Sequence, residues 1–502
     1  MPSRLPVVAT AEPLEAFVIG FDDLFTRLNQ RQAFRRYLEG LLLSNERNKT
    51  LTALANAEPI VGALHPSVQS LQFFLSESNW QAKRINAHRK QLLRECPATT
   101  PTARGVLVID ETGDRKDGKK TAHVARQYLA NLGKVDNGVV SVTSLYADEH
   151  LYYPLEVEPY TPSRWFEKGK QDTAFRTKPQ IALELVQQEV KEGLPFRAVV
   201  ADCFYGENDV FVSGLQGLEQ QGLEQNGGSN GNPIGFVLSL KRSHCWWHLA
   251  GEVGSLLEAA RLASWNEATK EGDWQPVVRT FADGHEETWY ALEVKTKAYH
   301  PEKSIRAVVA TTDPSLLPEA NTWFLMTNLP APDSVRASQS SQGQSSQGQS
   351  SLAPADLGEV VRLYSLRNWV EQGYKQVKHA LGWAQYQVRS DTAMRRHWTL
   401  VMCAFSFVWW NRGQGPEENQ ESNHNQNHYE TDPATEAEPV AEKKGREYFA
   451  RFSGFLRALA FGTTTDSFLA GPLDTGMAPL AGMDALASSG GVGTSVGKPA
   501  AR

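Results

Sequence analysis

The stretch that decides the fold is GVLVIDETGDRKDGKKTAHVARQ, residues 105–127. Its unbroken aliphatic run, residues 106–109, predicts a buried β-strand, and this strand leads into the carboxylate of Asp110. The segment that follows, GDRKDGK (residues 113–119), comes close to a phosphate-binding P-loop. The stretch therefore presents two alternatives, a nucleotide-binding loop or a carboxylate that holds a metal ion.

The P-loop alternative fails on its own chemistry. A P-loop carries Ser or Thr after its lysine to hold magnesium, but here Lys120 follows Lys119. The loop also contains Asp114 and Asp117, whose charges would repel phosphates. We expect a polar turn that leaves the strand, and no nucleotide cofactor.

Composition narrows the class of protein. With 502 residues and 41% apolar content, the chain should form about two to four folding units with real cores. Its four cysteines show no CxxC pair, which argues against a zinc site or a disulfide framework. No signal peptide is evident, and the longest apolar run, around residues 400–410, is too short to cross a bilayer. We expect a cytoplasmic protein with no membrane role.

The pattern along the chain predicts an N-terminal helical domain and then an α/β core. Residues 1–98 form the first unit, because residues 14–95 have helical periodicity and dense Arg and Lys. The first part of the core, residues 99–206, has the order strand, strand, strand, helix, strand: 106–110, 139–147, 151–160, 178–193 and 196–206.

This order places two acids together. A right-handed crossover would bring the fourth strand beside the first and parallel to it, so Asp110 and Asp202 would lie at the same end of neighbouring strands. Two facing carboxylates repel each other, and a hard divalent cation with oxygen ligands removes that cost. For either aspartate alone, a turn-forming role at a strand end is the more common explanation.

Residues 207–355 predict a β-rich insertion. Two low-complexity tracts, residues 214–233 and 337–351, bracket it and are expected to be flexible loops. Five strand-like segments lie in this region: 235–242, 274–281, 288–299, 304–312 and 321–329. Beyond the core, residues 413–502 predict a C-terminal helix and a largely disordered tail.

The core resumes over residues 356–412, where a helix begins with a capping signal at Asp356 and continues to about residue 383. Spacings of three, four, four and three put five polar residues on one helix face: Tyr364, Arg367, Glu371, Lys375 and Lys378. An apolar stripe about 100° away should anchor the helix, so that the polar face is presented. Glu371 is thus the candidate third acid, and we expect its carboxylate to converge with those of Asp110 and Asp202. A solvated face with a Glu371–Lys375 ion pair is the alternative.

The spacing Tyr364-x2-Arg367-x3-Glu371-x6-Lys378 resembles the Y-x2-R-x3-E-x6-K signature of bacterial insertion-sequence DDE transposases, the hairpin-forming group with a β-insertion in an RNase H-like core. Residues 73–80, 106–128 and 175–206 also resemble one branch of that group, so the likeness covers roughly residues 30–410. The resemblance implies an RNase H-like core interrupted by the β-rich insertion.

The resemblance also implies site residues. The catalytic triad that holds two Mg²⁺ ions, with Mn²⁺ as a substitute, falls on Asp110, Asp202 and Glu371. Three further residues, Tyr364, Arg367 and Lys378, correspond to contacts with DNA near the transposon end. Trp323 lies where related enzymes carry a tryptophan that stacks on a flipped base; a core position is the alternative for this ring.

The implied activity is that of a DNA transposase, which cuts an insertion sequence at its terminal inverted repeats and joins it to target DNA. The implied partners are double-stranded DNA, at the transposon ends and the target, and a second copy of the chain in a homodimer on DNA. Such a protein would be cytoplasmic and associated with the bacterial nucleoid when bound. We expect the basic N-terminal helices to bind phosphates through Arg27, Arg31, Arg35, Arg36, Arg47 and Lys49.

Two other classes of function remain open at this point. One is an RNase H-like nuclease that cuts without joining, and the other is a domesticated DNA-binding protein without catalysis. The low-complexity tracts and the acidic tail depart from the family pattern. All three acids are present, which favours a competent enzyme.

Overall fold

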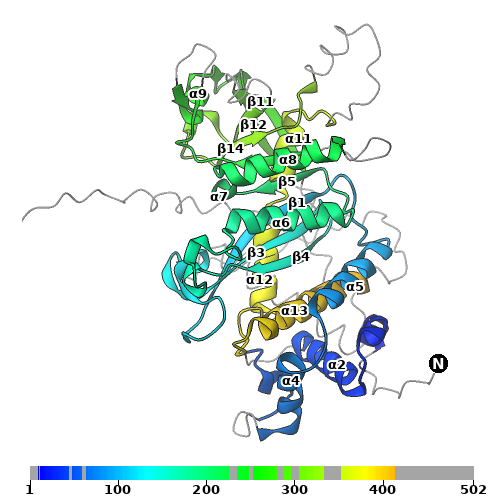
Figure 1. The fold of residues 1–502 in the computed structure, drawn as a ribbon. Helices are drawn as coiled ribbons and strands as arrows, with labels where there is room; N and C mark the ends of the chain where they lie inside the picture. The colour runs from blue at the N-terminus through cyan, green and yellow to red at the C-terminus, as the bar shows by residue number, and fades with distance from the viewer. Residues whose placement is uncertain are drawn as a thin grey trace, which may run out of the picture.

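The structure is a computed structural model that describes residues 10, 12–43, 48–58, 64–224, 234–247, 253–280, 286–294, 305–332 and 352–412. It has a large mixed sheet with helices on both faces and a group of helices at one end (Figure 1). The fold is therefore mixed α/β, as expected. In the described part of the chain, no helix is long and apolar enough to cross a membrane.

The predicted meander, crossover helix and parallel strand are confirmed. The strand order across the sheet is β11-β12-β13-β14-β6-β5-β1-β3-β2, with β4 paired to β3. The strands of the core half are Val106–Arg115 (β1), Ala125–Leu129 (β2), Lys134–Ala147 (β3), Tyr152–Pro159 (β4), Ala198–Ala201 (β5) and Phe236–Ser239 (β6). Helix α6 (Lys178–Lys191) connects β4 to β5, which lies parallel to β1.

Strand β1 is longer than the sequence predicts. The polar residues after Asp110 stay paired to β3 as far as Arg115, which lies opposite Gly138. The expected turn therefore begins only after Arg115. The reason is that α12 (Asn368–His379) covers this part of the strand, and Lys378 on that helix compensates the charge of Asp114.

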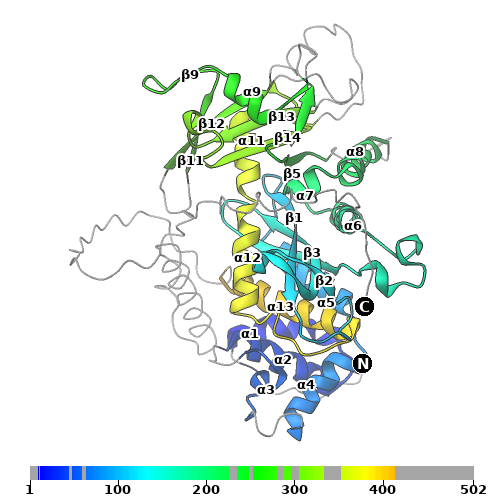
Figure 2. The same ribbon diagram turned by 90° about the vertical axis from the view of Figure 1, so that its left-hand side faces the viewer.

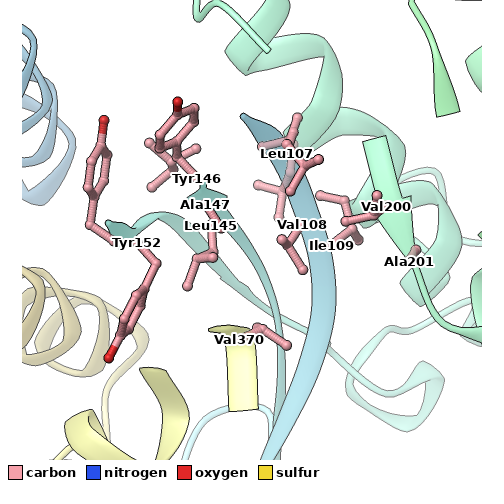
Figure 3. Close-up of a cluster of buried hydrophobic side chains, with 14 of the residues drawn as sticks. Leu107, Val108, Ile109, Leu145, Tyr146, Ala147, Tyr152, Val200, Ala201 and Val370 are labelled. Carbon is pink, nitrogen blue, oxygen red and sulfur yellow. The ribbon is translucent and has the colours of Figure 1, made fainter. Parts of the chain in front are cut away.

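The core half of the sheet is covered on both faces. Helices α6 and α8 (Asp209–Glu224) lie on one face and α12 on the other (Figure 2). Figure 3 shows the aliphatic residues of β1, Leu107, Val108 and Ile109, between side chains of β3 and β5. All three are fully buried, as expected for a strand of a sheet with two covered faces.

The five strands predicted for the insertion are all present, but they do not form a separate unit. β6 pairs parallel with β5, and β14 pairs antiparallel with β6, so the insertion extends the core sheet. The other insertion strands in this sheet are Gln275–Thr280 (β11), Glu286–Val294 (β12), Arg306–Thr311 (β13) and Thr322–Thr327 (β14). Two short hairpins lie apart from it: Cys245–Trp247 (β7) with Val253–Ser255 (β8), and Trp265–Asn266 (β9) with Glu271–Gly272 (β10).

The first low-complexity tract was wrongly expected to be a loop throughout. Its residues 214–224 belong to α8, because Phe211, Leu215 and Leu218 recur at helical spacing and are buried. A side chain at Gly214 would meet Leu183 of α6, so the glycine permits close packing of the two helices. The second tract and residues 413–502 lie outside the described residues.

The N-terminal helices pack on the last described helix, α13 (Asp391–Arg412), which is buried along most of its length. They are Glu12–Val18 (α1), Leu28–Leu42 (α2), Leu51–Leu54 (α3), Pro66–Ser76 (α4) and Ala82–Glu95 (α5). Buried Arg89 of α5 donates hydrogen bonds to Ser406 of α13, at 2.8 Å, and to the carbonyl of Leu155, also at 2.8 Å. One polar network thus joins the helical layer to the sheet.

The expected single helix from residue 356 is two helices, α11 (Leu357–Ser365) and α12, with a break at Leu366 and Arg367. Asp356 caps α11 by accepting a hydrogen bond from the Glu359 amide, as predicted. The break leaves α11 against β11 and β12, while α12 lies against β1 and β4. Arg367 therefore lies at the point where the chain passes from one half of the sheet to the other.

Candidate active site

Asp110 and Asp202 lie side by side at the sheet. Strands β1 and β5 are paired in parallel as far as Ile109 opposite Ala201, so the two aspartates are the next residues in register. Asp202 also caps the short helix α7 (Cys203–Gly206) by accepting a hydrogen bond from the Phe204 amide at 3.1 Å. The predicted neighbourhood of these two acids is confirmed.

The environment of Asp110 opposes its ionisation. Burial first, and the nearby charge of Asp202 after it, raise the pKa of Asp110 to about 7, although Arg367 acts in the opposite direction. The carboxylate accepts hydrogen bonds from the Glu111 amide, at 2.7 Å, and from Arg367, at 3.0 Å. A buried carboxylate beside a second one is costly to ionise unless a cation lies nearby.

Arg367 supplies that cation in this structure. Its guanidinium lies 3.0 Å from Asp110 and 4.0 Å from Glu371, and its pKa is raised by Asp110 first and also by Asp202 and Glu371, which together outweigh the effect of burial. Glu371 itself is 62% exposed. The expected convergence of three carboxylates is not met here: the described residues contain no group of three His, Cys, Asp or Glu side chains that could hold a metal ion.

The donor set nevertheless suits a hard divalent cation. All three acids offer carboxylate oxygens, the ligands that Mg²⁺ prefers. Asp110 and Asp202 are adjacent, and burial raises the pKa of Asp110, so a cation at this place would favour the charged form of its carboxyl group. Glu371 lies near the same guanidinium, so a shift of Arg367 is the change that would let a cation reach the acids.

The signature residues present a free polar face only at Glu371, whereas the expectation was that all of them would do so. Tyr364 is buried at 8% exposure, and Lys378 forms a 3.0 Å ion pair with buried Asp114 and donates to the carbonyl of Gly113. The helix face points toward the sheet because β1 carries the acids that these cations neutralise. Among the signature residues, the structure brings Arg367 to the predicted acids and places Lys378 farther along β1.

Trp323 belongs to an aromatic cluster at the junction of the insertion with α11. Its ring stacks on Trp289 with centroids 4.1 Å apart and contacts the ring of Tyr364 at 5.1 Å. The Arg279 guanidinium lies 5.6 Å from both tryptophan rings. Trp323 is half-buried, whereas Trp289 is only 2% exposed. The cluster connects the insertion directly to the helix that leads into Arg367.

Only some of the basic N-terminal residues that were expected to bind phosphates are exposed. Arg35 is buried and paired with Glu15 and Asp22, each at 2.6 Å. Arg31 and Lys49 are also buried, and Lys49 donates to the carbonyls of Gly40 and Leu43. These three cations therefore stabilise the helical layer and do not face DNA. Of the others, Arg27 and Arg36 are exposed and Arg47 lies outside the described residues.

Two charged pairs near the acids were not predicted. Glu111 forms a 2.8 Å ion pair with Lys178 of α6, and the pair of Asp114 with Lys378 lies four residues farther along β1 than Asp110. The sequence did contain a signal for the first, because Glu111 directly follows Asp110. Lys178 is 67 residues from Glu111 along the chain, and Lys378 is 265 residues from Gly113, the neighbour of Asp114. Local patterns cannot reveal partners so far away.

Comparisons with known proteins agree with this chemistry. Residues 20–229 match the family described as DDE superfamily endonuclease. The chain is 29% identical over 386 residues, 76% of this chain and 83% of the relative, to the "Probable transposase for insertion sequence element IS701" of Microchaete diplosiphon. Among solved structures, the NurA nuclease from Sulfolobus solfataricus aligns at 10% identity over 59% of this chain and 92% of its own, but with a TM-score of 0.23, which carries no argument about fold.

The family match covers Asp110 and Asp202, so the class of enzyme that this part of the chain resembles is a DDE-type endonuclease. The similarity to a transposase over three quarters of the chain narrows that class. Together the two matches support a DDE transposase.

Proposed function

We propose that this chain is a DDE transposase that cuts an insertion sequence at its terminal inverted repeats and joins it to target DNA, with Asp110, Asp202 and Glu371 as its catalytic acids. The observation that carries the assignment of residues is the register of β1 and β5, which puts Asp110 beside Asp202 with Arg367 between them and Glu371. The core would then be of the RNase H type, and the Y-x2-R-x3-E-x6-K group is the proposed branch.

Two Mg²⁺ ions held by Asp110, Asp202 and Glu371 would activate water and stabilise the leaving oxygen in phosphodiester cleavage. The chain contributes the positions of the acids, which follow from the strand register and from the packing of α12 on β1. Arg367 neutralises the acids before the substrate arrives, and a bound DNA phosphate offers the guanidinium another anion. Its transfer from Asp110 to DNA would free the carboxylate for the cation.

Joining needs no nucleotide, because each strand transfer exchanges one phosphodiester for another. We further propose that a homodimer holds the paired ends, and that Trp323, Tyr364 and Lys378 contact end DNA. These contacts require side chains that are now engaged within the protein to exchange partners.

The test uses labelled duplexes that carry the ends of the element surrounding this reading frame, incubated with target DNA in Mg²⁺ or in EDTA. We expect nicked, excised and joined products in Mg²⁺ alone. Asp110→Asn and Asp202→Asn should abolish all three products while end binding persists. Cleavage without joined products would instead support a nuclease, and cleavage by the aspartate variants would overturn the assignment of the acids.

A further inference from the structure

An open pocket lies just beyond the C-terminal end of β1. It has a volume of about 470 Å³ and is lined by Lys119, Arg126, Asn137, Arg164 and Trp165. Three of the five lining residues are cations and none is a carboxylate. Such a lining suits a polyatomic anion such as a phosphate group.

The cations of this pocket are available to a ligand. Lys119, Arg126 and Arg164 are all exposed, and no ion pair joins any of them to a carboxylate in the described part of the chain. The Arg164 guanidinium donates a hydrogen bond to the carbonyl of Val124, a neutral acceptor that positions the side chain without compensating its charge. Arg126 does lie near Asp136 and lowers the pKa of that carboxyl, though less than the hydrogen bond from the Asn137 amide does. Lys120, next to Lys119, adds a further exposed charge.

The frame around the cations is ordered by the sheet. Asn137 of β3 donates hydrogen bonds to the carbonyls of Lys116 and Gly118, which fixes the loop that carries Lys119. On the opposite side, the Trp165 indole donates to the carbonyl of Val124 at 3.0 Å. Trp165 remains 43% exposed, so its ring offers an apolar wall beside the charges.

The pocket lies on the same face of the sheet as the acids. Thr143 is paired with Asp110, and six residues along β3, an even number, lead to Asn137, which is paired with Arg126. Thr143 contacts Tyr374 of α12, so this is the face that α12 covers. At about 3.4 Å per residue, Asn137 is roughly 20 Å from Thr143.

We propose that this pocket binds a backbone phosphate of the same DNA duplex whose scissile phosphate lies at Asp110. Phosphates follow one another at about 3.4 Å of helix axis on each strand, so 20 Å corresponds to about six nucleotides from the cut. The proposal rests on the proposed function for the position of the cut. The bound phosphate belongs either to the element or to the flanking DNA, and its chemistry is the same in both.

The first test measures the salt dependence of binding to a random-sequence duplex of 30 base pairs in EDTA. The variant Lys119→Gln/Arg126→Gln removes two cations from the pocket. The matched control Lys191→Gln/Arg104→Gln removes two exposed cations from the end of α6 and the start of β1. Because one phosphate contact contributes about 0.9 to the log–log slope, and salt rises fourfold from 50 to 200 mM, the ratio of the affinities at these two salt concentrations should fall about three- to fourfold in the pocket variant only.

An unchanged slope in the pocket variant, or an equal fall in the control, would overturn the proposal. The second test is a hydroxyl-radical footprint on end duplexes, either cut flush or carrying flanking DNA. We expect protection about six nucleotides from the cut that is lost in the pocket variant. Protection on the duplex cut flush would assign the phosphate to the element. Protection only on the duplex that carries flanking DNA would assign it to the flank. Absence of such protection overturns the proposal. Failure of the wild type to cut in Mg²⁺ would instead reject the transposase function, because the salt test needs no cleavage.

Discussion

The guanidinium of Arg367 lies 3.0 Å from the carboxylate of Asp110 and 4.0 Å from that of Glu371. A residue expected to contact DNA is therefore the internal counter-cation of the candidate acids. Its position explains how the buried Asp110 carboxylate is accommodated beside Asp202. It also means that cation binding and the position of Arg367 are linked, because both compensate the same negative charge.

Arg367→Ala should destabilise the metal-free protein by about 3 kcal/mol, because it leaves the buried Asp110 carboxylate uncompensated. Mg²⁺ should restore more stability to this variant than to the wild type, since binding to the folded state alone stabilises it. Thermal melts in EDTA and in Mg²⁺ provide the measurement. The double variant Arg367→Ala/Asp110→Asn, which removes both charges, is the control and should recover part of the loss in EDTA.

Glu371→Gln should abolish cleavage and leave end binding intact, because the amide keeps the shape of the side chain but loses the charge that holds a cation. Glu371 is 62% exposed, so the change should alter the melting temperature little. Binding is measured by gel shift in EDTA and nicking on a denaturing gel in Mg²⁺. Nicking at the normal rate would show that Glu371 is an ordinary solvated helix residue.

The sequence predicted the neighbourhood of Asp110 and Asp202 because hydrophobic runs and the handedness of crossovers are strong constraints. It did not predict that β1 continues to Arg115. The segment after Asp110 is polar, and only the distant Lys378 makes burial of Asp114 tolerable. The ion pair with Lys378 therefore keeps in the sheet a polar segment that its own sequence predicts to be a turn.

Two further features escaped the sequence for related reasons. The break between α11 and α12 falls at Leu366 and Arg367, without a proline or glycine to mark it. The insertion strands joined the core sheet through β6 and β14, and a strand pattern does not specify which edge it will pair with. Arg31, Arg35 and Lys49 are buried although the surface was expected for them. The local sequence around a cation does not show which distant groups will pair with it.

Lys378→Met should destabilise the protein, because Asp114 is buried and accepts no hydrogen bond in the described structure, which leaves the ion pair as its compensation. A loss of about 3 kcal/mol is expected for breaking a buried pair. The double variant Lys378→Met/Asp114→Asn should regain much of that stability. If Lys378 also contacts DNA, end binding measured by gel shift stays weak in the double variant; restored binding would assign Lys378 a purely structural role.

His397 should make stability depend on pH. Burial first, and the charge of Lys116 after it, lower the pKa of His397 to about 4. Between pH 6.5 and 4 the imidazole of His397 binds a proton in the unfolded state but not in the folded state. The free energy of unfolding should therefore be highest above pH 6.5 and should fall by about 3 kcal/mol as pH drops through this window. His397→Gln should remove the dependence. The measurement compares the melting temperatures of the two proteins from pH 4 to 8, because the contributions of all other titrating groups cancel in the difference. A difference that stays constant with pH would contradict the prediction.

Trp323 separates hairpin formation from the other steps. If a flipped base stacks on its half-buried ring, Trp323→Ala should lose about 1 to 3 kcal/mol at the hairpin step while first-strand nicking survives. The stack with Trp289, at 4.1 Å, fixes the ring and already covers one of its faces, so a base has the other face or must displace Trp289. A time course on labelled end DNA should therefore show nicked ends that accumulate and few hairpins.

Trp289→Ala provides the matched structural control. Trp289 is 2% exposed, so its truncation should cost about 3 to 5 kcal/mol of stability and depress nicking and hairpin formation together. Trp323→Ala should lower the melting temperature less, because its ring is half-buried and its loss leaves a smaller cavity. If the two variants lose both products in parallel with equally lowered melting temperatures, Trp323 is a packing residue of the insertion, and the hairpin step must find its aromatic platform elsewhere.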